Sequence, residues 1–191
     1  MSKKYELVVD DTITFWGWKL FRIRALISFG SVDAGDLGGY IYTEDNLSQK
    51  GDAWVWGNAK VLGNAKVWGD AKVWGDAEVW GDAWVSGDAK VWGDAKVWGD
   101  AKVWGNAKVL GNAEVSGNAK VSDFGDVIVF KNHWSSGRHF TYTKSNKMWR
   151  VGCFYGTGQE LIDKAYRDSE KSGNFYKAYV EFIASLEGLG E

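Results

Sequence analysis

Hydrophobic and polar positions alternate along residues 51–122 in a pattern that repeats every six residues. Each hexad reads Gly, Asp or Asn, Ala, a mostly charged residue, Val, and a residue that is most often Trp. In an extended chain the Ala and Val fall on one side, and the fourth and sixth residues fall on the other. Gly-Asp and Gly-Asn suit corners because Gly and Asn tolerate left-handed backbone. The pattern predicts short strands joined by corners, with Val inside and Trp outside.

The six-residue period runs through twelve hexads without an insertion, and a degenerate thirteenth copy follows at 123–128. Helical periods do not fit six, whereas a sustained hexapeptide repeat is typical of a parallel β-helix. Three sides per turn give an 18-residue coil, and successive coils pair as parallel strands about 4.8 Å apart. The sequence therefore predicts an all-β solenoid, with the β-helix spanning residues 51–128.

Both flanks of the repeats are expected to be caps, because open coils expose core and unpaired strand edges. Residues 5–29 alternate as two strands around Gly17 and predict a β-hairpin. Residues 1–50 are thus assigned to an N-terminal hairpin and solenoid-entry cap.

The C-terminal flank, residues 129–191, is predicted to be a small α+β cap. Its first part reads as short antiparallel strands, including VIVFKN, RHFTYTK and KMWRVGCF. Thr157-Gly-Gln-Glu160 is a capping box that opens a helix to about residue 171. Gly173 and Asn174 are expected to separate this helix from a second one.

Two segments outside the regular repeats resemble a known family. The stretch from Leu20 to Val55, L-x-R-I-x-A-x-x-x-F-G-x-V-x-A-G-D-L-G-G-Y-I-x-x-x-x-N-L-S-x-x-G-D-A-W-V, is similar to the entry segment of YdcK-type bacterial and prophage-encoded hexapeptide-repeat proteins. The tail RVGCFYGTGQEL, residues 150–161, is similar to the C-terminal motif of short phage members. The resemblance implies a capped left-handed β-helix of the trimeric LpxA-like superfamily and a phage or prophage accessory role. It supplies no catalytic residues.

Outward residues that lie 18 positions apart stack on the same side of the coil and divide the repeats into three faces. One face is the richest in indoles and lysines, and we predict it to be a binding surface. Its candidate residues are Trp54, Trp56, Lys72, Trp74, Lys90, Trp92 and Lys108. We expect a stack of Trp56, Trp74 and Trp92 beside a row of the three lysines.

The outward indoles have several interpretations. Stacked like residues reinforce the ladder, and lysine over indole adds a cation–π attraction, so the indoles serve intrinsic stability in the simplest case. Nine outward indoles also exceed what a soluble monomer normally exposes, which favours self-association or a protein partner. Aromatic rows also suit the faces of sugars, so a glycan is a third candidate. We interpret the protein as a non-catalytic binding or scaffolding module.

Catalysis has little support from the repeats. An acyl- or acetyltransferase of the hexapeptide type needs a positioned histidine base, and residues 51–122 contain neither histidine nor cysteine. That alternative therefore depends on His133 or His139 in the C-terminal cap. Cys153 between Gly152 and Phe154 is expected to be packed core rather than a nucleophile. We predict no catalytic residues and no cofactor.

A metal site is not expected either. One corner of the coil stacks Asp52, Asp70, Asp88 and Asn106. Aspartate in a turn usually bonds its own backbone, and calcium-binding β-rolls use a different, nonameric pattern.

Composition restricts the partners and the compartment. The 191 residues carry a net charge of −2, so we expect no nucleic-acid partner and no attraction to an anionic membrane surface. No apolar run approaches the roughly 20 residues of a membrane span. The first residues lack the apolar stretch of a signal peptide, and the single cysteine fits a reducing compartment. These features predict a cytoplasmic protein.

Overall fold

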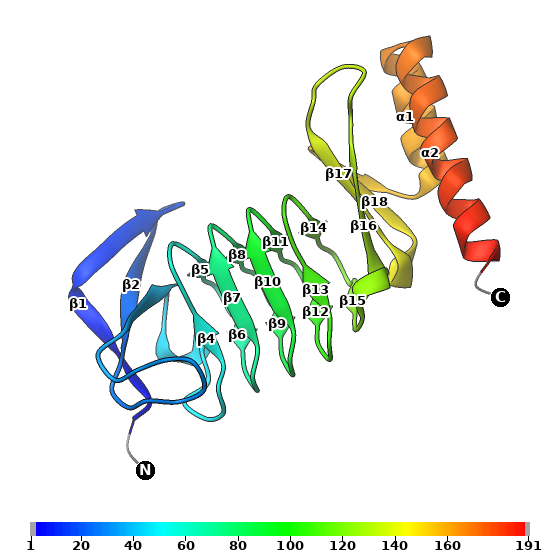
Figure 1. The fold of residues 1–191 in the computed structure, drawn as a ribbon. Coiled ribbons are helices and arrows are strands. Elements are labelled where there is room, and N and C mark those ends of the chain that lie inside the picture. The colour runs from blue at the N-terminus through cyan, green and yellow to red at the C-terminus, as the bar shows by residue number, and fades with distance from the viewer. Residues whose placement is uncertain (1–2, 190–191) are drawn as a thin grey trace.

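Three parts follow one another along the molecule in the computed structural model, which describes residues 3–189 (Figure 1). An antiparallel hairpin lies at one end, the repeats wind in the middle, and a small sheet with two helices lies at the other end. The predicted fold class, a parallel β-solenoid between a hairpin cap and an α+β cap, is confirmed.

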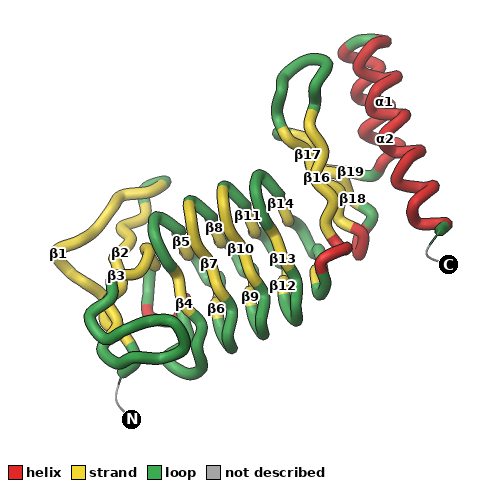
Figure 2. Tube along the Cα trace, in the orientation of Figure 1, coloured by secondary structure: helices red, strands yellow, loops and turns green. Residues whose placement is uncertain are grey.

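The hexads form twelve short strands that pair in parallel with strands 18 residues away. β4, β7, β10 and β13 make the first face; β5, β8, β11 and β14 the second face; β6, β9, β12 and β15 the third face. Figure 2 shows these short strands separated by turns in every coil. Their bounds are β4 Trp54–Val55, β5 Lys60–Val61, β6 Lys66–Val67, β7 Lys72–Gly75, β8 Glu78–Val79, β9 Trp84–Val85, β10 Lys90–Gly93, β11 Lys96–Val97, β12 Lys102–Val103, β13 Lys108–Val109, β14 Glu114–Val115 and β15 Lys120–Val121.

The bore of the solenoid is built from the alanines and valines of the hexads, all of which are buried. The predicted inward placement of the alanines and valines is therefore confirmed. The corner glycines have positive φ angles, for example 76° at Gly75, which other residues rarely adopt. A Cβ on Gly75 would also lie 3.0 Å from the amide nitrogen of Gly93 in the next coil. The glycine column is thus needed for backbone conformation and for close stacking.

The N-terminal hairpin is formed by β1 (Tyr5–Phe15) and β2 (Trp18–Ala25). Trp16 and Gly17 make the turn with φ angles of 49° and 80°, which agrees with the predicted turn at Gly17. β3 (Leu37–Ile41) then pairs antiparallel with β2 and parallel with β5. The hairpin is therefore continuous with the sheet of the second face.

The first coil presents backbone carbonyls to its N-terminal side, and the N-terminal cap supplies hydrogen-bond donors to all three faces. On the second face, the amide of Tyr40 in β3 donates to Ala59 O at 2.9 Å. On the third face, Asn46 Nδ2 donates to Gly63 O and to Ala65 O at 3.0 and 2.8 Å. On the first face, the ammonium of Lys4 donates to Gly51 O and to Ala53 O at 3.2 and 2.9 Å.

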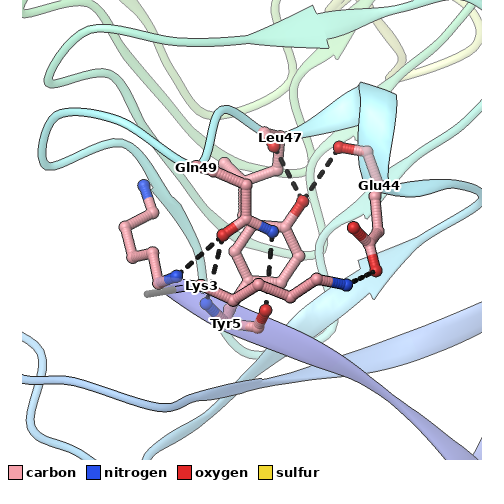
Figure 3. Close-up of polar contacts among 6 residues, drawn as sticks. Lys3, Tyr5, Glu44, Leu47 and Gln49 are labelled. Atoms are coloured by element: carbon pink, nitrogen blue, oxygen red, sulfur yellow. Dashed lines mark hydrogen bonds and ion pairs between the residues drawn. The ribbon is translucent and has the colours of Figure 1, made fainter. Parts of the chain in front are cut away.

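The segment that carries Asn46 is fixed by the first strand. The Tyr5 hydroxyl donates to the carbonyls of Glu44 and Leu47 at 2.9 and 2.7 Å (Figure 3). Gln49 Oε1 accepts the backbone amide of Lys4 at 2.8 Å. Tyr5 is fully buried, and burial raises the pKa of its phenol. The hairpin thus fixes the donors that close the first coil.

The C-terminal cap begins with an antiparallel sheet of β16 (Val127–Lys131), β17 (His139–Thr143), β18 (Met148–Val151) and β19 (Phe154–Gly156), in that order. Helices α1 (Gly158–Asp168) and α2 (Glu170–Gly188) pack against it around an aromatic core. Core residues include Phe140, Tyr142, Trp149 and Tyr176.

The predicted helix boundary in this cap is wrong. Thr157 caps α1 as expected, since its side chain accepts the amide of Glu160. The break between the helices lies at Ser169, whose side chain caps α2, and Gly173 lies inside α2. A Cβ on Gly173 would overlap the ring of Tyr166, so this glycine allows the two helices to pack closely.

The last coil presents backbone amides to its C-terminal side, and side chains of the cap accept some of them. Thr141 Oγ1 accepts the amide of Glu114 on the second face at 2.9 Å. Ser145 Oγ accepts the amide of Lys120 on the third face at 2.8 Å. Asp126 Oδ2 accepts the amide of Ser122 at 2.7 Å.

Candidate binding surface

The first face carries three parallel rows of outward side chains along the solenoid. Because its strands pair in register, equivalent residues of successive coils lie side by side. In chain order within each coil, a corner residue is followed by a lysine and then by an indole. The corner row is Asp52, Asp70, Asp88 and Asn106; the lysine row is Lys72, Lys90 and Lys108; the indole row is Trp56, Trp74 and Trp92.

Trp54 does not belong to this surface, and its predicted role as an outward binding residue is wrong. It occupies a lysine-equivalent position but is 0% exposed. Its ring makes edge-to-face contacts with Tyr5 and Phe29, at centroid distances of 6.0 and 5.4 Å. Residues of the N-terminal cap therefore fold over the first coil and bury Trp54 in its core.

The corner and lysine rows line a groove of about 720 Å³. Gly30 and Ser31 of the entry segment close it at the N-terminal end, and Asn106 and Lys108 lie at the other end. Among residues 3–189, neither the lysines nor the aspartates of these rows form an ion pair. A row of ammonium groups thus runs beside a row of carboxylates, and both are available to a ligand.

The indole row is only partly the predicted stack. Trp74 and Trp92 stack with a centroid distance of 4.9 Å and an interplanar angle of 3°. Trp56 packs on the core and contacts Trp54 edge to face at 6.5 Å. A separation of 4.9 Å is too short for two coplanar rings lying side by side, so the ring faces of Trp74 and Trp92 are turned toward each other. The row therefore presents indole edges to solvent.

A shallow hollow of about 320 Å³ lies between the indole row and the lysine row at the N-terminal end of the first face. Ser31, Trp56, Lys72 and Trp74 line it. Two indoles and a lysine side chain line this hollow together, so the first face offers both apolar and charged contacts.

The other two faces differ in how far the caps cover them. On the second face, Trp80 and Trp98 stack at 4.7 Å and 2°, much like the pair on the first face. Trp16 of the hairpin contacts Trp80, and the guanidinium of Arg150 lies over Trp98 at 5.0 Å. The caps at both ends therefore cover this second stack.

The third face has the most exposed indoles of the repeats. Trp68, Trp84 and Trp104 are 46%, 40% and 37% exposed, whereas Trp74 and Trp92 are half-buried. Trp68 meets Trp84 edge to face, and the ammonium of Lys102 lies 5.0 Å from the Trp84 ring centroid. The sequence predicted which face has the most indoles and lysines, but not which indoles are most exposed.

Comparisons with known proteins give no family for this chain. No protein-family model matches it, and no curated protein matches it. The resemblance of residues 20–55 and 150–161 to YdcK-type repeat proteins therefore remains an expectation.

The residues considered for catalysis lie in the C-terminal cap, away from the groove on the first face. His139 and Cys153 line the same hollow of about 200 Å³, together with Asn132 and Arg138. His133 instead contacts the rings of Trp134 and Phe175. Cys153 is exposed, and its predicted place in the packed core is wrong, because it lies in the turn between β18 and β19.

The described part of the chain contains no cluster of three or more His, Cys, Asp or Glu side chains arranged to hold a metal ion. The corner aspartates also take part in hydrogen bonds between successive coils, as when Asp70 Oδ1 accepts the amide of Asp52 at 3.0 Å. Within residues 3–189, neither helix combines the length and apolarity that a membrane crossing needs.

Lys4 is a buried cation at the edge of the groove on the first face, and the sequence did not predict it. Its side chain is buried, and burial lowers the pKa of its ammonium to about 8, although Asp52 and Asp70 oppose this shift. The ammonium also lies 4.8 Å from the ring centroid of Phe29. A lysine near the start of the chain carries no pattern that would predict a partner some 50 residues away.

Proposed function

We propose that the protein is a non-catalytic binding module that engages a protein partner, or a second copy of itself, through the first face. The observation that supports this proposal is the combination on one surface of a half-buried indole stack with ammonium and carboxylate rows that form no ion pair among residues 3–189. Apolar patches with a polar border are characteristic of interaction sites. Interface cores are rich in Trp and have polar rims, and charge complementarity there favours specific partners.

A rigid solenoid suits this role because its rows keep a fixed spacing. Each coil repeats the same Asp, Lys and Trp positions, and the backbone ladder fixes their separation. A partner that matches one coil can therefore match the next coil as well. This supports a scaffolding function in which several equivalent contacts add up.

A glycan ligand has less support. Sugar recognition by indoles uses the open face of the ring, and Trp74 and Trp92 turn those faces toward each other. An acyl-transfer function also has less support, since Asp, Asn, Lys, Gly and Ser are the residue types that line the groove of the first face. A general base of histidine type would have to act from the cap instead.

A phage or prophage accessory role is part of the proposal. It derives from the resemblance of the entry and tail segments and leaves the partner's identity open. An anionic or cationic small molecule is a less natural ligand for the groove, because both signs of charge run along its whole length.

The test compares two matched indole stacks. The double variant Trp74→Ser/Trp92→Ser removes the stack on the first face, and Trp80→Ser/Trp98→Ser removes the similar stack on the second face. Both pairs lose the same side chains and comparable stacking, but Trp80 and Trp98 also contact the caps, so we expect the second variant to lose more stability than the first. Light scattering over a range of protein concentrations measures self-association, and affinity capture from a bacterial lysate measures partner binding.

We expect the first double variant to lose association or capture and the second to retain it. Equal behaviour of the two variants would contradict the assignment to the first face. Calorimetry with acetyl-CoA tests the enzymatic alternative directly. Binding that disappears in His139→Ala would favour acyl transfer instead of a binding module.

A further inference from the structure

The hydrogen-bond ladder of the solenoid has a direction that leaves amides free at its C-terminal end. In each hexad the amides of the fourth and sixth residues donate to carbonyls of the following coil. Lys90 N, for example, donates to Ala107 O at 2.9 Å, and Trp104 N donates to Val121 O at 2.9 Å. The last coil has no following coil, so its amides need other acceptors or remain unpaired.

Strand β13, at the C-terminal edge of the first face, is an open edge. By the 18-residue spacing, the acceptors for the amides of Lys108 and Leu110 would be the carbonyls of Gly125 and Val127. Residues 124–126 instead form a 3-10 turn, and Val127 begins β16, which pairs with β17. Within residues 3–189, neither amide has a hydrogen-bond acceptor. On the other two faces, Thr141, Ser145 and Asp126 accept the amides of Glu114, Lys120 and Ser122, whereas the amide of Ser116 has no acceptor among residues 3–189.

An apolar groove of about 380 Å³ lies beside this open edge, between β13 and the start of the C-terminal sheet. Val127 at its floor also packs on the core of the solenoid. β16 on its far side is itself the edge strand of its sheet. The lining residues are Lys108, Leu110, Ala113, Phe124, Gly125, Val127, Ile128 and Val129.

We propose that the edge of β13 and this groove dock an extended peptide segment of a partner protein, added parallel to β13. Its carbonyls accept the amides of Lys108 and Leu110, and an aliphatic side chain enters the groove. Main-chain hydrogen bonds at an open sheet edge provide affinity, and pockets for alternate side chains provide specificity.

Charge complementarity defines a second feature of the segment. The residue that stacks next to Lys108 continues the row of Lys72, Lys90 and Lys108, which lie in register on adjacent strands and form no ion pair in the described part of the chain. The ammonium of Lys108 lies 5.7 Å from the ring centroid of Phe124 in the groove lining. Like charges on adjacent strands repel, so an acidic side chain is favoured at that position. The docked segment therefore has the order small, acidic, aliphatic. This inference depends on the β13 edge and does not require the indole row to bind anything.

The probe is a fluorescein-labelled peptide, acetyl-Gly-Asn-Ala-Glu-Val-Leu-Gly-Asn-amide, which follows the chain's own hexad with glutamate at the position next to Lys108. In the expected register, its alanine and valine carbonyls face the amides of Lys108 and Leu110. Fluorescence anisotropy with the full chain measures binding. We expect saturable binding of this peptide and weaker binding of the same peptide with lysine in place of glutamate.

Two variants of the protein test the geometry. Leu110→Pro removes the free amide, and we expect binding about tenfold weaker, the equivalent of one lost hydrogen bond. Leu110→Val keeps the amide and is the matched control. Lys108→Glu should reverse the preference between the glutamate and lysine peptides, which provides a readout that does not depend on the proline variant folding.

Three results would overturn the proposal. The first is the absence of saturable binding of the glutamate peptide, and the second is binding that neither Leu110→Pro nor Lys108→Glu alters. The third is dimerisation of the free chain that Leu110→Pro abolishes, because that result would assign the edge to a second copy. Failure of the indole variants described above would leave this test unaffected, so the two proposals fail separately.

Discussion

The two ends of the solenoid present opposite hydrogen-bonding groups to their caps. The first coil presents carbonyls and is closed on all three faces by donors: β3 amides, Asn46 and Lys4. The last coil presents amides, and on two faces side-chain oxygens of the cap, such as those of Thr141 and Ser145, accept some of them. The first face is closed at one end by a buried ammonium and left open at the other. The direction of the ladder thus decides which chemistry each cap needs, and the unclosed amides mark a place where another chain can add.

The largest effect is expected at the N-terminal end, from Asn46→Ala. The Asn46 amide nitrogen donates to two carbonyls of the third face, and its oxygen accepts the amides of Tyr42 and Thr43 at 3.1 and 2.8 Å. Because the side chain is buried, its removal leaves several polar groups unpaired, and we expect a loss of about 3 kcal/mol in the free energy of unfolding. Urea denaturation measures this loss.

Asn58→Ala is the matched control for Asn46→Ala, since Asn58 is an exposed corner residue of the first hexads. Its substitution is expected to change the free energy of unfolding by at most about 0.5 kcal/mol. A similar loss in both variants would show that closure of the first coil does not depend on Asn46.

A smaller effect is expected at the C-terminal end, from Thr141→Val. The substitution keeps the shape of the buried side chain and removes the oxygen that accepts the amide of Glu114. An unpaired amide in this position costs about 1–2 kcal/mol. Ser145→Ala removes an exposed acceptor, and water replaces it, so its loss should stay below about 1 kcal/mol. Equal losses of unfolding free energy in the two variants would show that the burial of the acceptor does not decide the cost of removing it.

An effect of similar size to that of Thr141→Val concerns the pH dependence of stability, through Lys4. Its folded-state pKa of about 8 lies below the value of 10.5 expected for the unfolded chain. Between these two values the unfolded state binds more protons, so the stability of the folded state rises with pH in this window. We expect the wild-type protein to gain about 1–2 kcal/mol from this group between pH 7 and 9.5.

Lys4→Met should remove this gain, and Lys3→Met, which alters an exposed neighbour, should keep it. Denaturation curves at several pH values below 9.5 avoid the ionisation of exposed tyrosines. If the stability of Lys4→Met still rises between pH 7 and 9.5, another titratable group is responsible for the rise.

Features that depend on residues close together in the sequence were predictable, and features that depend on contacts between distant residues were not. The solenoid, the buried Val column and the hairpin turn at Gly17 follow from local alternation and turn chemistry, and the sequence predicted all three. The burial of Trp54 was not predictable, because it depends on Tyr5 and Phe29 folding back over the first coil. Gly173 resembles a helix end by composition, yet it sits inside α2, where Tyr166 leaves no room for a side chain.

The candidate binding surface also has features that the sequence predicted and features that it did not. Periodicity placed Lys72, Lys90 and Lys108 in one row, and the parallel register agrees with that placement. The ring orientation of Trp74 and Trp92 depends on side-chain rotamers, about which periodicity carries no information. The open edge of β13 arises where the degenerate thirteenth hexad leaves the ladder to join another sheet. A sequence pattern shows that a copy is degenerate but not which hydrogen bonds it gives up.

Residue-resolved amide hydrogen exchange, followed by NMR in the free protein, tests the difference between the strand ends most directly. We expect the amides of Lys108 and Leu110 to exchange rapidly, because they have no acceptor among the described residues, and the amides of Lys90 and Glu114 to be strongly protected. Protection of Lys108 and Leu110 equal to that of Lys90 would mean that this edge is closed in solution and would contradict the account.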